Sequence, residues 1–225
     1  MHQAFNFEYL ETPWNAPKLR AVVAESLAAY GAVDAPSTWV LSNHDVIRHA
    51  SRLALTGDVP QGTGIGPLSE VQAVDLPDDA RQDPTWFRTH GERYGRDGCR
   101  VPIPWTADGP SFGFNSSGAS WLPQPTQWAE LARDVQRDQP DSTLSLYRRA
   151  LAERRAHAVG TGELEWLDGY GDDVVAFRNG DITVIANVGA TPVQLPAGAT
   201  VVLASAPLED GAIGSDTTVW LEGGR

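Results

Sequence analysis

Three polar residues able to do chemistry stand together in this sequence: Asn43, His44 and Asp45. They directly follow Thr38–Leu41, an apolar, β-branched run with the length of a buried strand. Active sites of α/β barrels lie at strand ends, because the strand fixes a side chain that the following loop exposes. An Asp beside a His suits a pocket that binds hydroxyl groups and stabilises developing positive charge. The alternative is that the triplet only caps a helix beginning near Val46.

The segments before and after this triplet predict a βα unit. Residues 4–10 alternate aromatic and polar side chains, which indicates a short strand. Residues 18–30 place apolar side chains at helical spacing, and Gly31 follows as a natural helix end. With the strand at 38–41, this order implies two parallel strands joined by a right-handed crossover. A second helix is expected from Val46 to about Leu55.

The stretch 57–125 is different, since it is rich in Gly, Pro, Asp and Ser and has no long periodic segment. So long a structureless span inside a compact domain is either functional or a sign of a missing element. Within it, Arg96 and Asp97 form either a charged pair at a pocket rim or a solvent-exposed turn, and the residues alone favour the turn.

The C-terminal part switches from helical to strand periodicity. Helices are expected at 125–136 and 142–157, and a linker follows at 158–162. Asn179-Gly180 between two strand-like runs indicates a hairpin. We therefore expect a domain at 1–159 and an all-β domain at 160–225. The all-β domain is predicted to have short strands at 164–167, 174–178, 183–187, 192–195, 200–203 and 218–221.

Composition limits the classes of function. The chain has 225 residues and a net charge of −12, which argues against nucleic-acid and anionic-membrane partners, because both need basic surfaces. Cys99 is the single cysteine, so no internal disulfide can form. We find no apolar run of membrane-spanning length and no signal peptide, so a cytoplasmic location is expected. His44 and His49 have the wrong spacing for a helical metal site, and we expect no metal and no cofactor.

Several motifs together resemble the C-terminal half of α-glucosidases of the α-amylase family of glycoside hydrolases, most closely the actinobacterial, oligo-1,6-glucosidase-like type. Residues 38–45 are similar to that family's last conserved catalytic motif, at the end of the seventh barrel strand. Residues 95–105 are similar to its loop after the eighth strand, and 4–10 to its sixth strand. Residues 171–178 are similar to the start of its antiparallel C-terminal domain.

The resemblance implies retaining hydrolysis of α-glucosidic bonds in maltose- or isomaltose-type oligosaccharides. Such chemistry uses one carboxylate as nucleophile and a second carboxyl as acid/base. By resemblance, Asp45 is a third carboxylate that stabilises the transition state. His44 and Asn43 bind the sugar in the same subsite, and Arg96 is similar to an arginine near the substrate.

The chain also departs from the family pattern. The family's nucleophile and acid/base lie upstream of every residue in this chain. Between Gly66 and Glu70, where the family has a helix and its eighth strand, only three residues remain. The expected fold is therefore a partial (β/α)8 barrel with about strands 6–7 and the last helix, followed by an antiparallel β-sandwich.

A substitute pair of catalytic carboxylates is not expected. The candidates all lie in turn-like sequences where we expect solvated side chains, and solvation does not raise a pKa as a general acid requires. We therefore expect a truncated chain that is inactive alone. These candidates are Asp78, Asp79, Asp83, Asp97, Asp172 and Asp173.

Two alternatives of other classes stay open. A separate N-terminal fragment could complement this chain and supply the missing carboxylates. Alternatively, the chain is a non-catalytic sugar-binding or interaction module, because aromatic faces stack on sugars. The tryptophans considered for that role are Trp86, Trp105, Trp121 and Trp166.

Overall fold

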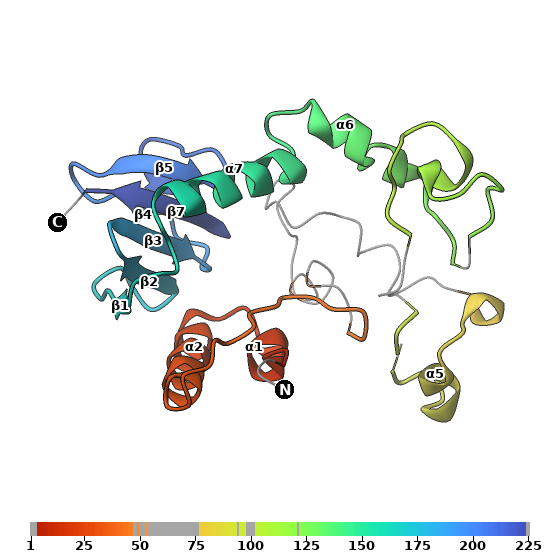
Figure 1. Cartoon of the computed structure of the whole chain (residues 1–225), viewed down its shortest axis with the longest axis horizontal. Coiled ribbons are helices and arrows are strands. Elements are labelled where there is room, and N and C mark those ends of the chain that lie inside the picture. Colours follow the sequence, from red (N-terminus) through yellow and green to blue (C-terminus); the bar gives the residue numbers. More distant parts are fainter. Residues whose placement is uncertain are drawn as a thin grey trace. The chain divides into compact units, whose positions relative to one another are not determined.

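The computed structural model describes residues 4–46, 49, 53, 77–93, 95–97, 102–120 and 122–223. The chain divides into two compact units. One consists of Met1–Val40, Gln61–Gly64 and Leu146–Arg225, and the other of Leu41–Pro60 and Ile65–Ser145. Figure 1 shows the helices and strands of both. None of the helices in the described ranges is long and apolar enough to cross a membrane.

The two predicted N-terminal strands are reduced to a single bridge. Phe5 pairs with Thr38 in parallel orientation, and the Asn6 N–H donates to the Thr38 carbonyl over 3.1 Å. The predicted strand at 4–10 is wrong beyond this point, because helix α1 occupies Phe7–Glu11. The Asn6 side chain caps that helix by accepting from the Tyr9 N–H. The strand predicted at 38–41 is likewise wrong, although its parallel direction is confirmed at Thr38.

Helix α2 spans Ala16–Gly31 and confirms the helix predicted at 18–30. Asn15 caps its first turn, and Leu19 and Val22 are buried on one side of the helix. Asn6 ties the helix to the bridge, because its side-chain amide donates to Ser26 Oγ at 2.8 Å and to Ser37 Oγ at 3.1 Å. A buried polar residue thus joins the two segments that a longer parallel ladder was expected to join.

The all-β prediction is confirmed as a five-stranded antiparallel sheet in the order β1-β2-β3-β7-β5. The hairpin between the second and third strands pairs Asn179 with Ile182, so its two central residues are Gly180 and Asp181. Gly180 has a φ of +61°, which favours glycine. The strands are β1 (Leu164–Trp166), β2 (Val174–Asn179), β3 (Ile182–Asn187), β5 (Thr200–Ala204) and β7 (Thr217–Glu222).

A second, two-stranded sheet covers one face of the larger one. It pairs β4 (Val193–Gln194) with β6 (Ala212–Ile213), and β6 was not predicted. The buried core between the sheets contains Ala176, Ile185, Ile213, Val219 and Leu221. Alternation along the strands places these large-sheet residues on one face, as in a sandwich.

Helix α2 packs against the opposite, aromatic face of the large sheet. The register puts Trp166 beside Phe177, and their rings pack edge to face with centroids 6.0 Å apart. The Arg20 guanidinium of α2 lies over the Trp166 ring and pairs with Asp168 at 2.6 Å. The N-terminal segment therefore belongs to the same compact unit as the β strands, while the predicted domain boundary at 159/160 stays a prediction.

Helix α7 (Thr143–Ala156) confirms the helix predicted at 142–157. After it, Asn179 organises the linker to the first strand. Its side-chain oxygen accepts from the Gly160 N–H at 2.6 Å, and its amide nitrogen donates to the Gly162 carbonyl at 2.8 Å. A strand residue thus helps to fix the linker, together with the hydrogen bonds that Thr161 donates to the Ala158 carbonyl.

The second unit contains short helices and turns. The helix predicted at 125–136 is wrong as one element, because the N–H groups of Arg133 and Asp134 donate to the carbonyls of Pro104 and Trp105 instead. The buried apolar residues of this unit include Leu122, Trp128 and Ala132. The predicted helix at 46–55 lies mostly outside the described residues. The elements are η2 (Asp78–Ala80), α5 (Pro84–Arg88), η3 (Pro110–Gly113), η4 (Thr126–Ala129) and α6 (Arg133–Arg137).

Asn187 gives a test of how the two sheets are joined. Its side chain is 1% exposed, accepts from the Gly189 N–H, and donates to three carbonyls, of Thr191, Ile213 and Gly214. Asn187→Ala removes these four hydrogen bonds and leaves the buried Ile213 carbonyl without this donor, so we expect a loss of about 1–3 kcal/mol in unfolding free energy, measured by urea denaturation. Asp181→Ala, at the exposed hairpin turn, is the control and should change stability little. Equal effects of both variants would contradict this account.

Candidate functional site

The Asn43–Asp45 triplet forms a turn fixed by its own first residue. Asn43 is buried, and its Oδ1 accepts from the Asp45 N–H at 2.8 Å and the Val46 N–H at 3.0 Å. This is an Asx-type cap, in which a short polar side chain satisfies the next backbone donors. Asn43 Nδ2 is buried and has no hydrogen-bond partner within the described part of the chain. In this geometry Asn43 acts by orienting Asp45 rather than by presenting its own side chain to solvent.

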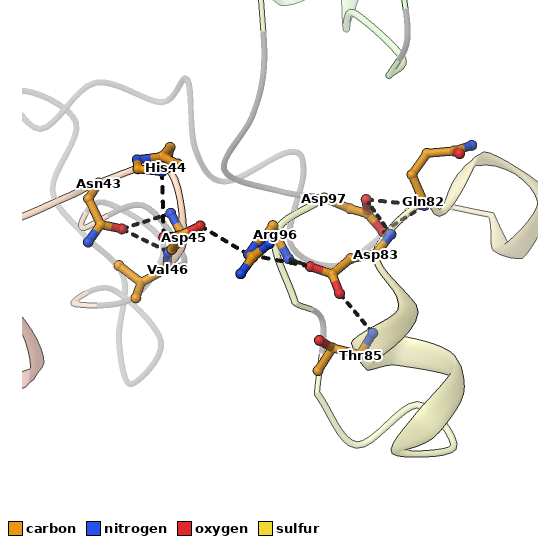
Figure 2. Close-up of polar contacts among 9 residues, drawn as sticks. All are labelled: Asn43, His44, Asp45, Val46, Gln82, Asp83, Thr85, Arg96 and Asp97. Carbon is orange, nitrogen blue, oxygen red and sulfur yellow. Dashed lines mark hydrogen bonds and ion pairs between the residues drawn. The ribbon is translucent and has the colours of Figure 1, made fainter.

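Asp45 lies between two basic side chains. The Arg96 Nε is 3.0 Å from Asp45 Oδ1, and the His44 Nε2 is 3.5 Å from Asp45 Oδ2. All three side chains are partly exposed, at 36% for Asp45, 53% for Arg96 and 64% for His44. Figure 2 shows the 43–46 turn facing Arg96. The structure therefore brings Asp45 and Arg96 together, as predicted site residues from distant segments, with His44 beside them.

Two aspartates that sequence reasoning placed in solvent are buried at this site. Asp83 is 8% and Asp97 is 5% exposed, so the expectation of solvated turns is wrong for both. Asp83 caps α5, and its Oδ1 accepts from the Thr85 N–H at 2.7 Å. The Asp83-Pro84 pair was the available signal, since Asp at the N-cap followed by Pro typically starts a helix.

The two buried carboxylates also bind each other's segment. Asp83 Oδ2 accepts from the Arg96 backbone N–H at 2.9 Å. In return, the Asp97 carboxylate accepts from the backbone N–H groups of Gln82 and Asp83, at 3.0–3.1 Å. Asp83 Oδ2 also lies 3.9 Å from Arg96 Nε. Figure 2 shows Arg96 between Asp45 and this pair.

Burial of Asp83 disfavours its charged form, but hydrogen bonds outweigh that cost. The Thr85 side chain and N–H, the Arg96 N–H and the Arg96 charge all favour the carboxylate. Together they hold the Asp83 pKa below its ordinary value. A carboxyl with a lowered pKa is ionised at neutral pH and is a poor general acid.

The arrangement suits binding and charge stabilisation of a polyhydroxylated ligand. Asp45 offers carboxylate oxygens that accept from hydroxyl groups, and Arg96 and His44 offer N–H donors beside it. Within the described ranges, no group of three or more His, Cys, Asp or Glu side chains could hold a metal ion.

The tryptophans considered for sugar stacking have other contacts. Trp86 carries the Arg81 guanidinium 3.6 Å above its ring and donates from Nε1 to Asp78. Trp166 lies under Arg20, as described above, and Trp105 is 47% exposed. Trp121 lies outside the described residues. Of the three that the structure describes, Trp105 is the most exposed.

Comparison with known proteins gives relatives of one kind. A protein of Rhizobium meliloti (strain 1021) named "Probable alpha-glucosidase" is 34% identical over 192 residues, which cover 75% of this chain and 33% of that protein. The salivary alpha-glucosidase of Anopheles gambiae is 28% identical over 183 residues, 71% of this chain and 30% of that protein. The chain spans about a third of the length of the curated relatives it matches. No family model matches the chain.

Solved structures agree with these relatives. The alpha-glucosyl transfer enzyme XgtA superposes with a TM-score of 0.80 and 27% identity, over 99% of this chain and 46% of that one. A mutant isomaltulose synthase from Erwinia rhapontici NX5 superposes with a TM-score of 0.77 over 100% of this chain and 51% of that one, and at 17% identity it shows the fold alone. The chain is thus similar to α-glucosidases and to glucosyl-transferring enzymes of the α-amylase family, which confirms that part of the resemblance.

The Asp83 hydrogen bonds predict a specific titration. Because the folded pKa lies below the ordinary value of 3.8, ionised Asp83 contributes stability above pH 3.8, and this is lost as pH falls through the folded pKa. We expect the backbone N–H resonances of Thr85 and Arg96 to titrate together in NMR spectra, with a midpoint below 3.8.

Matched variants separate this titration from that of other groups. Asp83→Asn should abolish it, whereas Asp79→Asn, which removes an exposed carboxylate of the same unit, should leave the midpoint in place. A midpoint at or above 3.8 in the unmodified chain would show that burial, not hydrogen bonding, dominates at Asp83.

Proposed function

We propose that this chain is the C-terminal part of an α-glucosidase of the α-amylase family, and that it forms one wall of the pocket that binds the glucosyl unit. The observation that carries the proposal is the pairing of Asp45 with Arg96 at 3.0 Å. These residues lie on the two segments that resemble the family's catalytic motif and its loop after the eighth strand. The sequence relatives support the same assignment.

In this proposal Asp45 stabilises the transition state of a retaining hydrolysis. The transition state has oxocarbenium character, so a carboxylate held near the sugar ring favours it electrostatically. Asp45 also accepts from sugar hydroxyls, while His44 and Arg96 donate to the sugar. Asn43 contributes to this wall by fixing the turn that carries Asp45. The substrate class is an α-linked gluco-oligosaccharide of the maltose or isomaltose type.

The nucleophile and the acid/base belong to the rest of the enzyme in this proposal. A retaining site needs two carboxyl groups about 5–5.5 Å apart. Asp83 and Asp97 do not suit these roles, because both are buried and bound to backbone N–H groups. We therefore propose that the chain alone is inactive and that a complementing N-terminal segment completes the site. A partial barrel contributed by this chain, an actinobacterial, oligo-1,6-glucosidase-like type and a cytoplasmic location remain predictions from the sequence.

A hybrid enzyme tests the proposal. The segment of the Rhizobium meliloti relative that matches this chain is replaced by this chain, and hydrolysis of p-nitrophenyl α-glucoside is measured. We expect no turnover from the chain alone and measurable turnover from the hybrid. Asp45→Asn in the hybrid should lower kcat by about 100-fold or more, as for loss of one preorganised electrostatic group. Asp79→Asn is the control, with unchanged kcat.

The outcomes separate the proposal from its alternatives. Turnover by the chain alone would refute the inactive state and would require catalytic carboxylates within it. A folded hybrid whose kcat is insensitive to Asp45→Asn would refute the assignment of Asp45. A non-catalytic sugar-binding module is the remaining alternative. Sugar binding by the chain alone fits both the proposal and this alternative, so the alternative is identified by a hybrid that folds but has no turnover.

A further inference from the structure

Arg96 extends from a backbone that is fixed on both sides. Its own N–H is bound by Asp83 Oδ2. The residue before it, Gly95, has a φ of +67° and lies so close to Asp83 that a Cβ there would be 2.7 Å from the Asp83 Cγ. The residue after it, Asp97, is buried and bound to the backbone of residues 82 and 83. The backbone at Arg96 is therefore held by hydrogen bonds, and its side chain extends from this fixed point toward Asp45.

The hydrogen bonds of Asp83 and Asp97 are reciprocal, because each carboxylate receives N–H groups from the segment that carries the other. Removing Asp83 frees the N–H groups of Thr85 and Arg96, and removing Asp97 frees those of Gln82 and Asp83. Loss of either carboxylate therefore weakens the contact between the two segments. The acceptors are charged and buried, and such hydrogen bonds are stronger than neutral ones. Asp83 also caps α5, so the same carboxylate links this pair of segments to a short helix.

An arginine side chain loses much rotational entropy when it is held in one geometry. A half-exposed ion pair contributes little stability to offset this loss. The Arg96–Asp45 contact is of this kind, with side chains 53% and 36% exposed. A fixed backbone lowers the entropy that remains to be lost, so the guanidinium reaches Asp45 more often. Asp83 Oδ2, at 3.9 Å from Arg96 Nε, also offers a second carboxylate oxygen to the same cation.

We propose that Asp83 and Asp97 are positioning residues for the sugar site, which hold Arg96 opposite Asp45. When a sugar hydroxyl donates to Asp45 in place of Arg96, the Asp83 carboxylate still compensates the charge of Arg96. This inference rests on the proposed function for the identity of the ligand, but not for the geometry of Arg96. Asp83 and Asp97 themselves touch no substrate.

The test uses NMR spectra of the whole chain, with the Arg96 Nε–H resonance as the direct readout. Asp45→Asn removes the partner charge, so this variant gives the position of the resonance without the ion pair. We expect Asp83→Asn and Asp97→Asn to shift the Arg96 Nε–H resonance toward its position in Asp45→Asn. Asp79→Asn should leave it in place. Resonances of Trp128 and Ala132, which are buried in the same unit as these residues, report that each variant remains folded.

Binding of D-glucose, followed in the same spectra, is the second readout. We expect the glucose Kd to rise about tenfold in Asp83→Asn and Asp97→Asn, which corresponds to the loss of one well-placed hydrogen bond to a charged group. Should an asparagine variant fail to fold, Gly95→Ala replaces it. That variant keeps every carboxylate but forces a methyl group against Asp83, and it should shift the Arg96 resonance in the same direction.

The outcomes distinguish the two proposals. An Arg96 Nε–H resonance that stays unchanged in Asp83→Asn, Asp97→Asn and Gly95→Ala overturns the positioning role, whatever glucose does. A shifted resonance with an unchanged glucose Kd overturns the link between positioning and sugar binding. An unmodified chain whose residues 43–46 and 96 do not respond to glucose counts against the sugar pocket, while the Arg96 resonance still decides the positioning role.

Discussion

Hydrogen bonds from buried polar side chains to backbone groups are the interaction on which this structure depends. In the second unit, Asp83 and Asp97 bind backbone N–H groups across two segments, and Asn43 binds those of its own turn. An unpaired backbone group in a buried place costs free energy, so each of these side chains both satisfies the backbone and fixes its course. The unit has few regular elements, and these side chains set its turns.

The first unit uses the same principle with amides instead of carboxylates. Asn6 joins α1, α2 and the bridge at Thr38, Asn179 holds the linker after α7, and Asn187 joins the two sheets. An amide both donates and accepts, so one side chain can satisfy carbonyls and N–H groups together. The apolar core between the sheets supplies the burial, and the asparagines fix where the connecting segments run.

At the candidate site, the residues that could bind a ligand differ from those that fix the backbone. Asp45 and Arg96 are partly exposed and therefore available to a ligand, whereas the groups that hold them are buried. Binding residues on loops work only when the loops are fixed by a rigid base. The similarity to α-glucosidases and glucosyl-transferring enzymes supports the proposal that Asp45 and Arg96 bind a glucosyl unit.

The sequence by itself determined the elements whose signals are local. Period-two alternation identified the strands at 174–178 and 183–187, and helical spacing identified α2 and α7, because each pattern lies within one short segment of the chain. The motif at Asn43–Asp45 was likewise visible in the sequence. Only the tertiary structure decided that residues 4–10 form a bridge and a helix, since the Asn6 cap competes with the alternating pattern. It alone also showed that Asp83 and Asp97 are buried and that each binds the backbone of the segment carrying the other. These hydrogen bonds join residues 13–15 positions apart, and no local pattern carries that information.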